Sequence, residues 1–456
     1  MKVAVTGGSG LLGTLVLRAL ARDRAIKSIV SLDMRPPLVA SAKLQIVQAD
    51  VRDPDLARHF EGCDAVVHLA FVVTRHVDRA LFEAVNVGGS ENVFRAAAQA
   101  GVKQIVHASS IAAYGVVPGH PVPITEDTPR HFQAEFPYAA TKYAVEAILD
   151  GFEPAHPDIA ITRLRPSIIL GRGMEHALGR SLAKGFMLDM GGPPMALVWG
   201  EDVADAVLLA LKNKAKGAFN LSADEPRPAS ELAREAGLRA LRVPRRLALS
   251  AAELGVWLER MGVGEADDPS WVRLPSATMV ISSERAKRVL GWKPRCATAR
   301  DVLRRHVEAV PGRVDRRIAT FMRLVDMGGR KPPDPSRLRG ISARVHLCLE
   351  GKGGGDFTIV VDNEQVRVER GAPRPPRSVV LLKAQTFLDL MAGREDPASA
   401  QIVGKVRIEG DPFAGFVLSG MIHGFRQQQH GPGSRAKIAR ALKMWFARGG
   451  SATAPR

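Results

Sequence analysis

Residues 1–13, "MKVAVTGGSGLLG", place a short apolar strand directly before a glycine-rich turn. The stretch "LLGTLVLRALAR" then repeats its apolar residues at helical spacing. Gly7, Gly10 and Gly13 lie in this strand-to-helix turn, where small residues let the backbone approach a pyrophosphate. The helix N-terminus adds free N–H groups and the positive end of the helix dipole. The opening of the chain therefore predicts a nucleotide-binding turn.

Strand-like and helical segments continue to alternate after this turn. The stretches "SIVSLD", "LQIVQAD", "AVVHLAF" and "KQIVHASS" are typical of strands, and an alanine-rich helix closed by Gly101 separates the last two. Alternation at this spacing predicts an α/β fold with a doubly wound, parallel, Rossmann-type sheet. The ligand crevice of such a sheet lies at the carboxyl ends of its strands.

An acidic residue ends the second of these strands. Asp33 follows Gly13 by 20 residues, which is the position that hydrogen-bonds an adenosine ribose. A carboxylate there repels a 2′-phosphate, so we predict NAD as the cofactor. Arg35 leaves NADP open, because a guanidinium at that place accepts the same phosphate.

A second set of residues supplies acid/base chemistry. "YAATK" places Tyr138 and Lys142 four residues apart on one face of a helix. A phenol with a pKa near ~10 is a poor base at neutral pH, and we expect the ammonium and a bound nicotinamide cation to lower that pKa. Ser109 and Ser110, after the preceding strand, offer hydroxyls to hold a substrate oxygen.

With these motifs, residues 1–310 resemble the extended short-chain dehydrogenase/reductases, the NAD-dependent epimerase/dehydratase group. "TGGSGLLG", "ADVRD", "VVHLAF", "NVGGSENV" and "RLRPSIILG" match that family's cofactor segments. The resemblance implies a substrate subdomain, catalysis by Ser110, Tyr138 and Lys142, and no metal. The cofactor-binding residues that it implies are Gly7, Gly10, Leu11, Leu12, Gly13, Asp33, Asp50, Val51, Leu69, Ala70, Phe71, Asn86, Tyr138, Lys142, Pro166 and Ser167.

Departures from the family pattern reduce the number of candidate reactions. Sugar dehydratases carry acidic residues just after the serine pair, where this chain has Ile111, Ala112 and Ala113. "RLRPSIILG" resembles the 3β-hydroxysteroid dehydrogenase branch more than the sugar-nucleotide epimerases, and "GFMLDMGGPPMALVWG" is largely apolar. We therefore expect an NAD-dependent oxidoreductase acting on a secondary alcohol or ketone of a sterol-like or other lipid substrate. A sugar-nucleotide epimerase and a non-catalytic lipid-transfer or scaffold protein remain alternatives.

The chain changes character after residue 310. A Pro/Gly/Arg-rich stretch around residues 328–340 is typical of a linker. Short strands, the helix-like "AQTFLDLMAG" and the alternating strand "GKVRIEGD" then predict a small α+β domain. Residues 335–430 resemble a sterol carrier protein 2 domain, which implies an apolar tunnel for a lipid or sterol-like molecule. We expect domains at 1–310 and 341–430, a linker at 311–340 and a basic tail at 431–456.

Net charge and aromatic content limit the classes of binding partner. The net charge is +17, of which residues 301–456 supply +12, from 27 Lys and Arg against 15 Asp and Glu. Only 5% of residues are aromatic, which argues against nucleic-acid binding by base stacking and leaves peripheral contact with an anionic membrane as the better interpretation. The three cysteines are isolated, and no leader or membrane span is evident, so we predict a cytoplasmic protein. We also expect a homo-oligomer.

Overall fold

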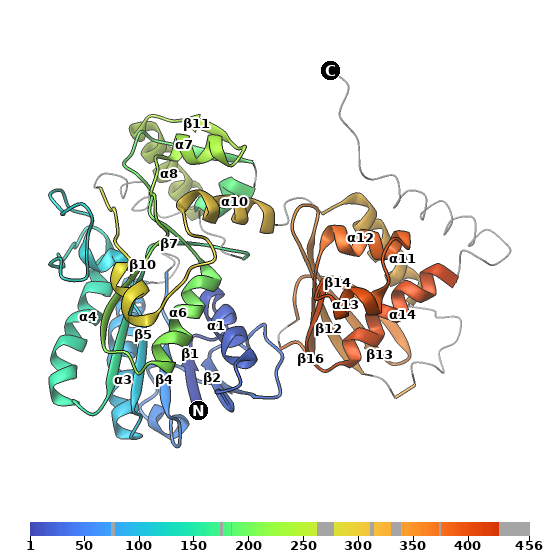
Figure 1. Cartoon of the computed structure of the whole chain (residues 1–456), viewed down its shortest axis with the longest axis horizontal. Helices are drawn as coiled ribbons and strands as arrows, with labels where there is room; N and C mark the ends of the chain where they lie inside the picture. The colour runs from blue at the N-terminus through green and yellow to red at the C-terminus, as the bar shows by residue number, and fades with distance from the viewer. Residues whose placement is uncertain are drawn as a thin grey trace. The chain divides into compact units, whose positions relative to one another are not determined.

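The computed structural model describes residues 1–73, 78–173, 177–183, 185–261, 278–310, 314–329, 339–340, 342–373 and 375–427. These residues form two compact units (Figure 1). The first unit comprises Met1–Pro37 and Lys43–Val307, and the second comprises Leu38–Ala42 and the chain from Glu308 onward. The predicted basic tail, 431–456, lies outside the described residues. Among the described helices, none is both long enough and apolar enough to cross a membrane.

The first unit is built on a seven-stranded sheet whose neighbouring strands all pair in parallel. Its strands are, in sheet order, β10 (Gly217–Leu221), β6 (Ala160–Pro166), β5 (Gln104–Ala108), β4 (Ala65–His68), β1 (Lys2–Thr6), β2 (Ser28–Asp33) and β3 (Leu44–Gln48). Val3, Ala4 and Val5 of the interior strand β1 are fully buried, as expected for a strand covered on both faces. The predicted α/β class with a doubly wound parallel sheet is confirmed.

Helices follow these strands in the order that the alternation predicted. They are α1 (Leu11–Arg22), η1 (Leu56–His59), α2 (Arg79–Glu83), η2 (Ala84–Gly88), α3 (Gly89–Gln99), η3 (Ile111–Tyr114), α4 (Pro137–Ala155) and α6 (Gly200–Lys212). The alanine-rich helix differs from the prediction, because one turn of π-helix, η2, interrupts it around Asn86. Such turns are frequent at functional sites.

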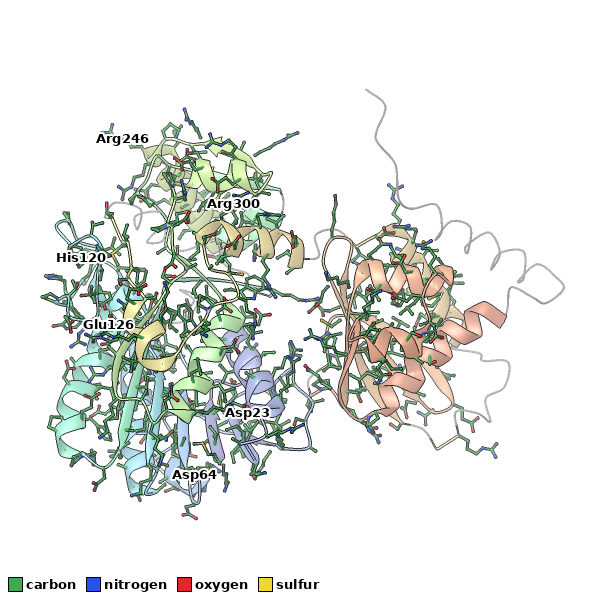
Figure 2. The ribbon with its side chains drawn as sticks, in the orientation of Figure 1. Asp23, Asp64, His120, Glu126, Arg246 and Arg300 are labelled. Carbon is green, nitrogen blue, oxygen red and sulfur yellow. The ribbon has the colours of Figure 1, made fainter. Side chains whose placement is uncertain are left out.

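A smaller part of the first unit follows β6. It contains the two-stranded parallel sheets β7 (Ile168–Leu170) with β9 (Leu197–Trp199) and β8 (Phe186–Asp189) with β11 (Arg239–Arg242). Its helices are α5 (Ala177–Ala183), α7 (Ala229–Glu235), α8 (Arg245–Arg260), η5 (Ala286–Leu290) and α10 (Ala299–Ala309). Two residues labelled in Figure 2 make polar contacts within the first unit. Asp23 forms an ion pair with Lys212 at 2.5 Å, and the Asp64 carboxylate accepts a hydrogen bond from the Lys2 N–H at 2.7 Å.

The second unit is a five-stranded mixed sheet with helices on one face (Figure 1). Its strands are, in sheet order, β14 (Gln365–Arg370), β13 (Gly355–Asp362), β12 (Ala343–Glu350), β15 (Ser378–Lys383) and β16 (Val406–Gly410). All neighbours pair antiparallel except β12 and β15, which are parallel. The predicted strand "GKVRIEGD" is the edge strand β16, with Val406 buried and Arg407 exposed.

Apolar side chains from the helices and from one face of the sheet form the core of the second unit. The helices are α11 (Arg316–Gly329), α12 (Ala384–Ala392), α13 (Pro397–Ile402) and α14 (Phe413–Gln427). Ile318, Phe321 and Met322 of α11 are buried in this core together with Phe387 of α12. The segment predicted as a linker, 311–340, therefore includes a helix that belongs to the second core.

Candidate functional site

The glycine-rich turn between β1 and α1 is closed to any larger side chain. Gly7 has a φ of +76°, and a Cβ there would lie 2.4 Å from the backbone nitrogen of Ala70. A Cβ on Gly13 would lie 2.1 Å from the Gly7 carbonyl oxygen. Helix α1 starts after Gly10 without a side-chain cap, so its first N–H groups are free to bind an anion. This turn fits the pyrophosphate of a dinucleotide.

Asp33 stands at the end of β2, beside the same turn. Its carboxylate accepts hydrogen bonds from the backbone N–H groups of Ser9 at 3.0 Å and Arg35 at 3.2 Å. The Ser9 hydroxyl in turn donates to the Arg35 carbonyl oxygen. Asp33 therefore fixes the turn as well as presenting a charge where a ribose is expected.

The other proposed cofactor residues fall into three groups. Leu11 and Leu12 open α1, and Leu69, Ala70 and Phe71 follow the end of β4. Asp50 and Val51 follow β3, and the guanidinium of Arg52, which donates to the Asp50 carboxylate, lowers the pKa of that carboxyl. Pro166 ends β6, and Ser167 after it is buried, with a hydroxyl oxygen that has no hydrogen-bond partner among the described residues.

Asn86 in the π-helical turn η2 is fully buried. Its side chain accepts a hydrogen bond from the Val72 N–H at 2.7 Å and donates one to the Val72 carbonyl oxygen at 2.9 Å. Both bonds hold the backbone just after Phe71. Asn86 therefore shapes the loop after β4.

Ser110 and Tyr138 meet at the carboxyl end of β5. Ser110 caps η3, because its hydroxyl oxygen accepts the Ala112 N–H at 3.2 Å. Burial raises the pKa of the Tyr138 phenol, and a hydrogen bond with Ser110 acts in the opposite direction. The lowering expected from the sequence involves a bound nicotinamide cation as well as Lys142, and it stays a prediction.

Lys142 lies one helical turn beyond Tyr138 and is 3% exposed. Its Nζ donates to the Ala108 carbonyl oxygen at 2.8 Å and lies 3.4 Å from the centre of the Phe71 ring. The same Nζ is 5.9 Å from the centre of the Tyr138 ring. Burial lowers the pKa of Lys142 to about 7. The structure thus brings Ser110, Tyr138, Lys142 and Phe71 together.

A buried carboxylate behind this group was missed by the sequence analysis. Glu146, four residues beyond Lys142, accepts hydrogen bonds from Arg165 at 2.8 and 2.5 Å and from the Ser109 hydroxyl at 2.5 Å. Arg165 also donates to the Tyr114 hydroxyl at 2.7 Å. Ser109 is therefore engaged inside the protein, while Ser110 remains the candidate for holding a substrate oxygen.

The network extends to β10 at the edge of the seven-stranded sheet. The Tyr114 hydroxyl donates to Asn220 Oδ1 at 2.8 Å, and the Asn220 N–H donates to Glu126 at 2.8 Å (Glu126 is labelled in Figure 2). Burial by itself raises the pKa of Glu146, but the Arg165 hydrogen bonds outweigh it, so that pKa lies below its usual value. Tyr114, at the end of η3, and Arg165, near the end of β6, are thus members of a buried ion network.

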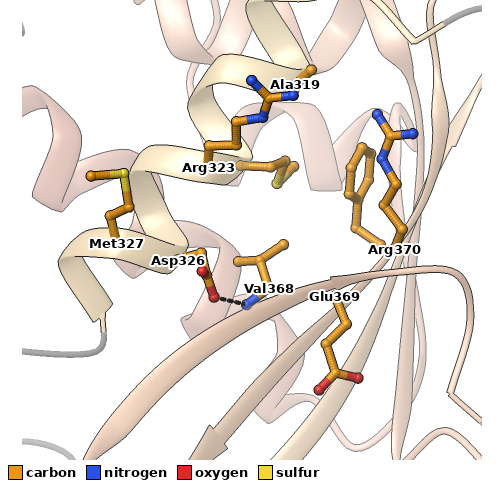
Figure 3. A pocket seen from close by; sticks show the side chains of 9 residues that line it. Ala319, Arg323, Asp326, Met327, Val368, Glu369 and Arg370 are labelled. Atoms are coloured by element: carbon orange, nitrogen blue, oxygen red, sulfur yellow. Dashed lines mark hydrogen bonds between the residues drawn. The ribbon is translucent and has the colours of Figure 1, made fainter.

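The second unit holds a pocket of about 350 Å³ between α11 and the strands β13 and β14 (Figure 3). Its apolar lining comes from Ala319, Met322, Met327, Phe357 and Val368, and its charged lining from Arg323, Asp326, Glu369 and Arg370. The Asp326 carboxylate accepts the Val368 N–H at 3.0 Å and so ties the helix to the sheet. The pocket is of the size of small-molecule sites and combines an apolar wall with two guanidinium groups.

Two parts of the chain match known family models. Residues 3–222 match the NAD dependent epimerase/dehydratase family, and residues 324–422 match the SCP-2 sterol transfer family. Both families agree with the resemblances found in the sequence. The NAD dependence of the first family agrees with the predicted cofactor.

Individual relatives cover mainly the first part. An uncharacterized protein of Mycobacterium tuberculosis is 28% identical over 65% of this chain and 81% of its own length. The UDP-glucose 4-epimerase of Mycolicibacterium smegmatis is 29% identical over 66% of this chain and 96% of its own length. The N-acetyl-alpha-D-glucosaminyl-diphospho-ditrans,octacis-undecaprenol 4-epimerase of Escherichia coli O157:H7 is 30% identical over 47% of this chain and 64% of its own length.

A solved structure shows the same fold. The dTDP-glucose 4,6-dehydratase DesIV of Streptomyces venezuelae, with NAD and TYD bound, superposes with a TM-score of 0.52 at 22% identity. The likeness covers 67% of this chain and 95% of that protein. At this level of identity it concerns the fold.

Proposed function

From a first domain of the NAD dependent epimerase/dehydratase family and a second of the SCP-2 sterol transfer family, we propose an NAD-dependent oxidoreductase of lipid substrates. Its substrate is a secondary alcohol or ketone on a sterol-like or other lipid molecule. The observation that carries the proposal is that one chain joins the Ser110, Tyr138 and Lys142 group to a unit with a partly apolar pocket.

The residues of the first unit take separate roles in this proposal. The Ser110 hydroxyl holds the substrate oxygen, and the Tyr138 hydroxyl donates a proton to it or, as phenolate, takes one from it. NAD, when bound, supplies the hydride acceptor or donor. The turn at Gly7, Gly10 and Gly13 would hold its pyrophosphate, and Asp33 its adenosine ribose.

The surroundings of the Lys142 ammonium suggest its role. Its ammonium lies between the Ala108 carbonyl oxygen and the Phe71 ring, where a pKa of about 7 lets it gain or lose a proton near neutral pH. We propose that it sets the electrostatic potential at the Ser110 and Tyr138 pair and anchors the cofactor side of the site.

The second unit would hold the apolar part of the substrate. The pocket under α11 offers Met322, Met327 and Phe357 to a hydrocarbon, and Arg323 and Arg370 to an anionic group. Burying apolar surface there contributes about 25 cal/mol per Å². The excess of basic residues after residue 300 supports docking on anionic membranes, where such substrates accumulate.

The relatives favour a second candidate, an epimerase of a nucleotide-linked or lipid-linked sugar. UDP-glucose 4-epimerases align over nearly their whole length, and one relative acts on a sugar joined to a polyprenyl diphosphate. A lipid-linked sugar would also give the second unit a lipid to hold. Against this candidate stands the apolar "GFMLDMGGPPMALVWG", which offers little to bind a diphosphate.

Net cofactor turnover separates the two candidates. The purified full chain is mixed with NAD and either a detergent-dispersed hydroxysteroid or a UDP-hexose, and NADH absorbance and the stereochemistry of the sugar are followed. We expect stoichiometric NADH from the apolar alcohol and no change in the sugar. Epimerised sugar with no net NADH would replace the first candidate with the second.

Lipid binding is tested on the same full chain with a fluorescent fatty acid. Met327→Asp places a carboxylate in the pocket at a side chain that is 71% exposed, so folding is not at risk. We expect about tenfold weaker binding, which corresponds to about 1.4 kcal/mol of lost apolar contact. The control Gln365→Asp adds the same charge on exposed β14 outside the pocket lining and should bind like the parent.

A further inference from the structure

Three potential metal ligands converge on the second unit. His346 and Cys348 stand on β12 and Asp356 on β13, and one donor atom of each lies within 4.8 Å of the others. They occupy the sheet face opposite to the apolar core, because Val345, Leu347 and Leu349 between and beside them point into that core. The cluster is therefore separate from the pocket under α11.

The strand geometry explains why the three side chains meet. His346 and Cys348 are two residues apart, so they project from the same face of β12. Asp356 is the antiparallel partner of Cys348, which places their Cβ atoms about 4.5–5.5 Å apart. Two ligands on β12 and a third on the neighbouring strand β13 form a triangle. Regular β-structure alone positions these three side chains.

The imidazole of His346 uses only one of its two ring nitrogens in a hydrogen bond among the described residues. Its Nε2 lies 2.7 Å from Asp356 Oδ1, whereas its Nδ1 is buried and has no hydrogen-bond partner among the described residues. A buried polar atom left without a partner costs about 1–3 kcal/mol. Asp356 faces Nε2, so a cation shared by His346 and Asp356 binds at Nε2, and that ion does not remove the cost at Nδ1.

Burial and access both suit a bound ion. The side chain of His346 is only 4% exposed and Cys348 is 3% exposed, while the side chain of Asp356 is 37% exposed. Cys348 packs with Ala40 and with Val379 and Leu381 of β15, so its surroundings in this cluster are apolar. The partly exposed Asp356 gives an ion its path from solvent, and a water would be the fourth ligand.

We propose that His346, Cys348 and Asp356 bind a thiophilic divalent cation, with zinc as the ion of choice. One nitrogen, one sulfur and one oxygen ligand with an open fourth position match the coordination that zinc accepts. Binding converts the Cys348 thiol to a thiolate and releases its proton to solvent, so affinity rises with pH. Zinc joins β12 to β13 and stabilises the sheet that carries the lipid pocket.

The test uses the metal-stripped full chain, zinc, and a competing chromophoric chelator. We expect one tight site per chain and a higher melting temperature of the parent in the presence of zinc. Cys348→Ala and Asp356→Asn should each weaken zinc affinity at least about 100-fold, since each removes a ligand. Cobalt substitution should give a thiolate charge-transfer band that Cys348→Ala abolishes.

Controls keep the outcome clear when a variant folds poorly. Cys63→Ala removes a buried thiol of the first unit and should bind zinc like the parent. Asp356→Asn keeps a hydrogen-bond acceptor for His346 and changes a partly exposed side chain, so its folding should match the parent. Absence of tight zinc binding by the parent, or unchanged affinity in both Cys348→Ala and Asp356→Asn, overturns the proposal.

Discussion

The two units bury different kinds of side chain. The first unit buries the charged residues Lys142, Glu146, Arg163 and Arg165 directly behind its candidate active site. In the described part of the second unit, no Lys, Arg, Asp or Glu is buried to the same degree. Proton and hydride chemistry needs charges fixed in a low-dielectric setting, whereas holding a lipid needs apolar surface. The contrast ties each unit to its proposed task.

The sharpest test of this contrast is Glu146→Gln. Removing the carboxylate leaves Arg165 buried without its ion-pair partner, whereas Arg163 keeps its pairs with Asp150 and Glu153. We expect the first unit to lose about 3–5 kcal/mol of unfolding free energy. Hydrogen exchange of peptides from each unit measures the loss separately. A loss below about 1 kcal/mol would mean that the network contributes little.

The pH dependence of that loss identifies its cause. The folded-state pKa of Glu146 is lowered, so its stabilising contribution is present above the unfolded value, 4.5, and is lost as pH falls through the folded-state value. The matched control Phe387→Ala creates a cavity in the second core and should cost about 3–5 kcal/mol at every pH.

Tyr138→Phe tests the chemistry of the first unit. Loss of the proton-transferring hydroxyl should reduce turnover at least about 100-fold, equivalent to about 2.7 kcal/mol, and leave NAD affinity nearly unchanged. Single-turnover kinetics and cofactor titration measure the two effects. Parent-like turnover would remove Tyr138 from the catalytic group, and unchanged fatty-acid binding in the second unit serves as the control.

Lys142→Met tests whether burying the Lys142 ammonium costs unfolding free energy. Its pKa of about 7 in the folded state lies below the ordinary 10.5, so the unfolded chain binds more protons between these values. The parent should therefore gain up to about 1.4 kcal/mol of stability per pH unit, relative to the variant, as pH rises from 7 toward 10.5. Denaturant unfolding at pH 7.5 and 9 gives the difference, and a constant difference contradicts the burial argument.

Asp33→Ser should produce the smallest effect. It removes the charge that repels a 2′-phosphate, so we expect the preference for NAD over NADP to fall roughly tenfold. A change of that size is comparable to the free energy of one hydrogen bond to a charged group. Because Asp33 also accepts the Ser9 and Arg35 N–H groups, Asp33→Asn is the matched control that retains an acceptor for the turn. A parent that already prefers NADP would transfer the role to Arg35.

The sequence was sufficient for the fold because its signals are local. The glycine turn, the alternation of strands and helices, and the spacing of Tyr138 and Lys142 each involve neighbouring residues. Helix α11 had a readable signal as well, since Ile318, Phe321 and Met322 recur at helical spacing. The Pro/Gly-rich stretch that follows it led to the assignment of the whole segment as a linker.

The environment of the site could not be predicted in the same way. Glu146 continues the spacing of Tyr138 and Lys142 along α4, but its role depends on Arg165 of β6 and on Ser109, which follows β5. Likewise, the position of the Lys142 ammonium over Phe71 is set by packing between two segments that are far apart in the sequence. The raised pKa of Tyr138 follows from burial, which no local pattern expresses.

The parallel pairing of β12 and β15 affects how the second unit folds during its synthesis on the ribosome. Strands β12, β13 and β14 are consecutive hairpins and can pair as soon as they emerge. The central edge of β12 stays open until residues 378–383 follow, and β16 and α14 come later still. An open apolar edge is a site for association with other chains. A pause in translation after β14 has left the ribosome, but before residues 378–383 have emerged, should therefore be the moment at which nascent chains aggregate or recruit chaperones.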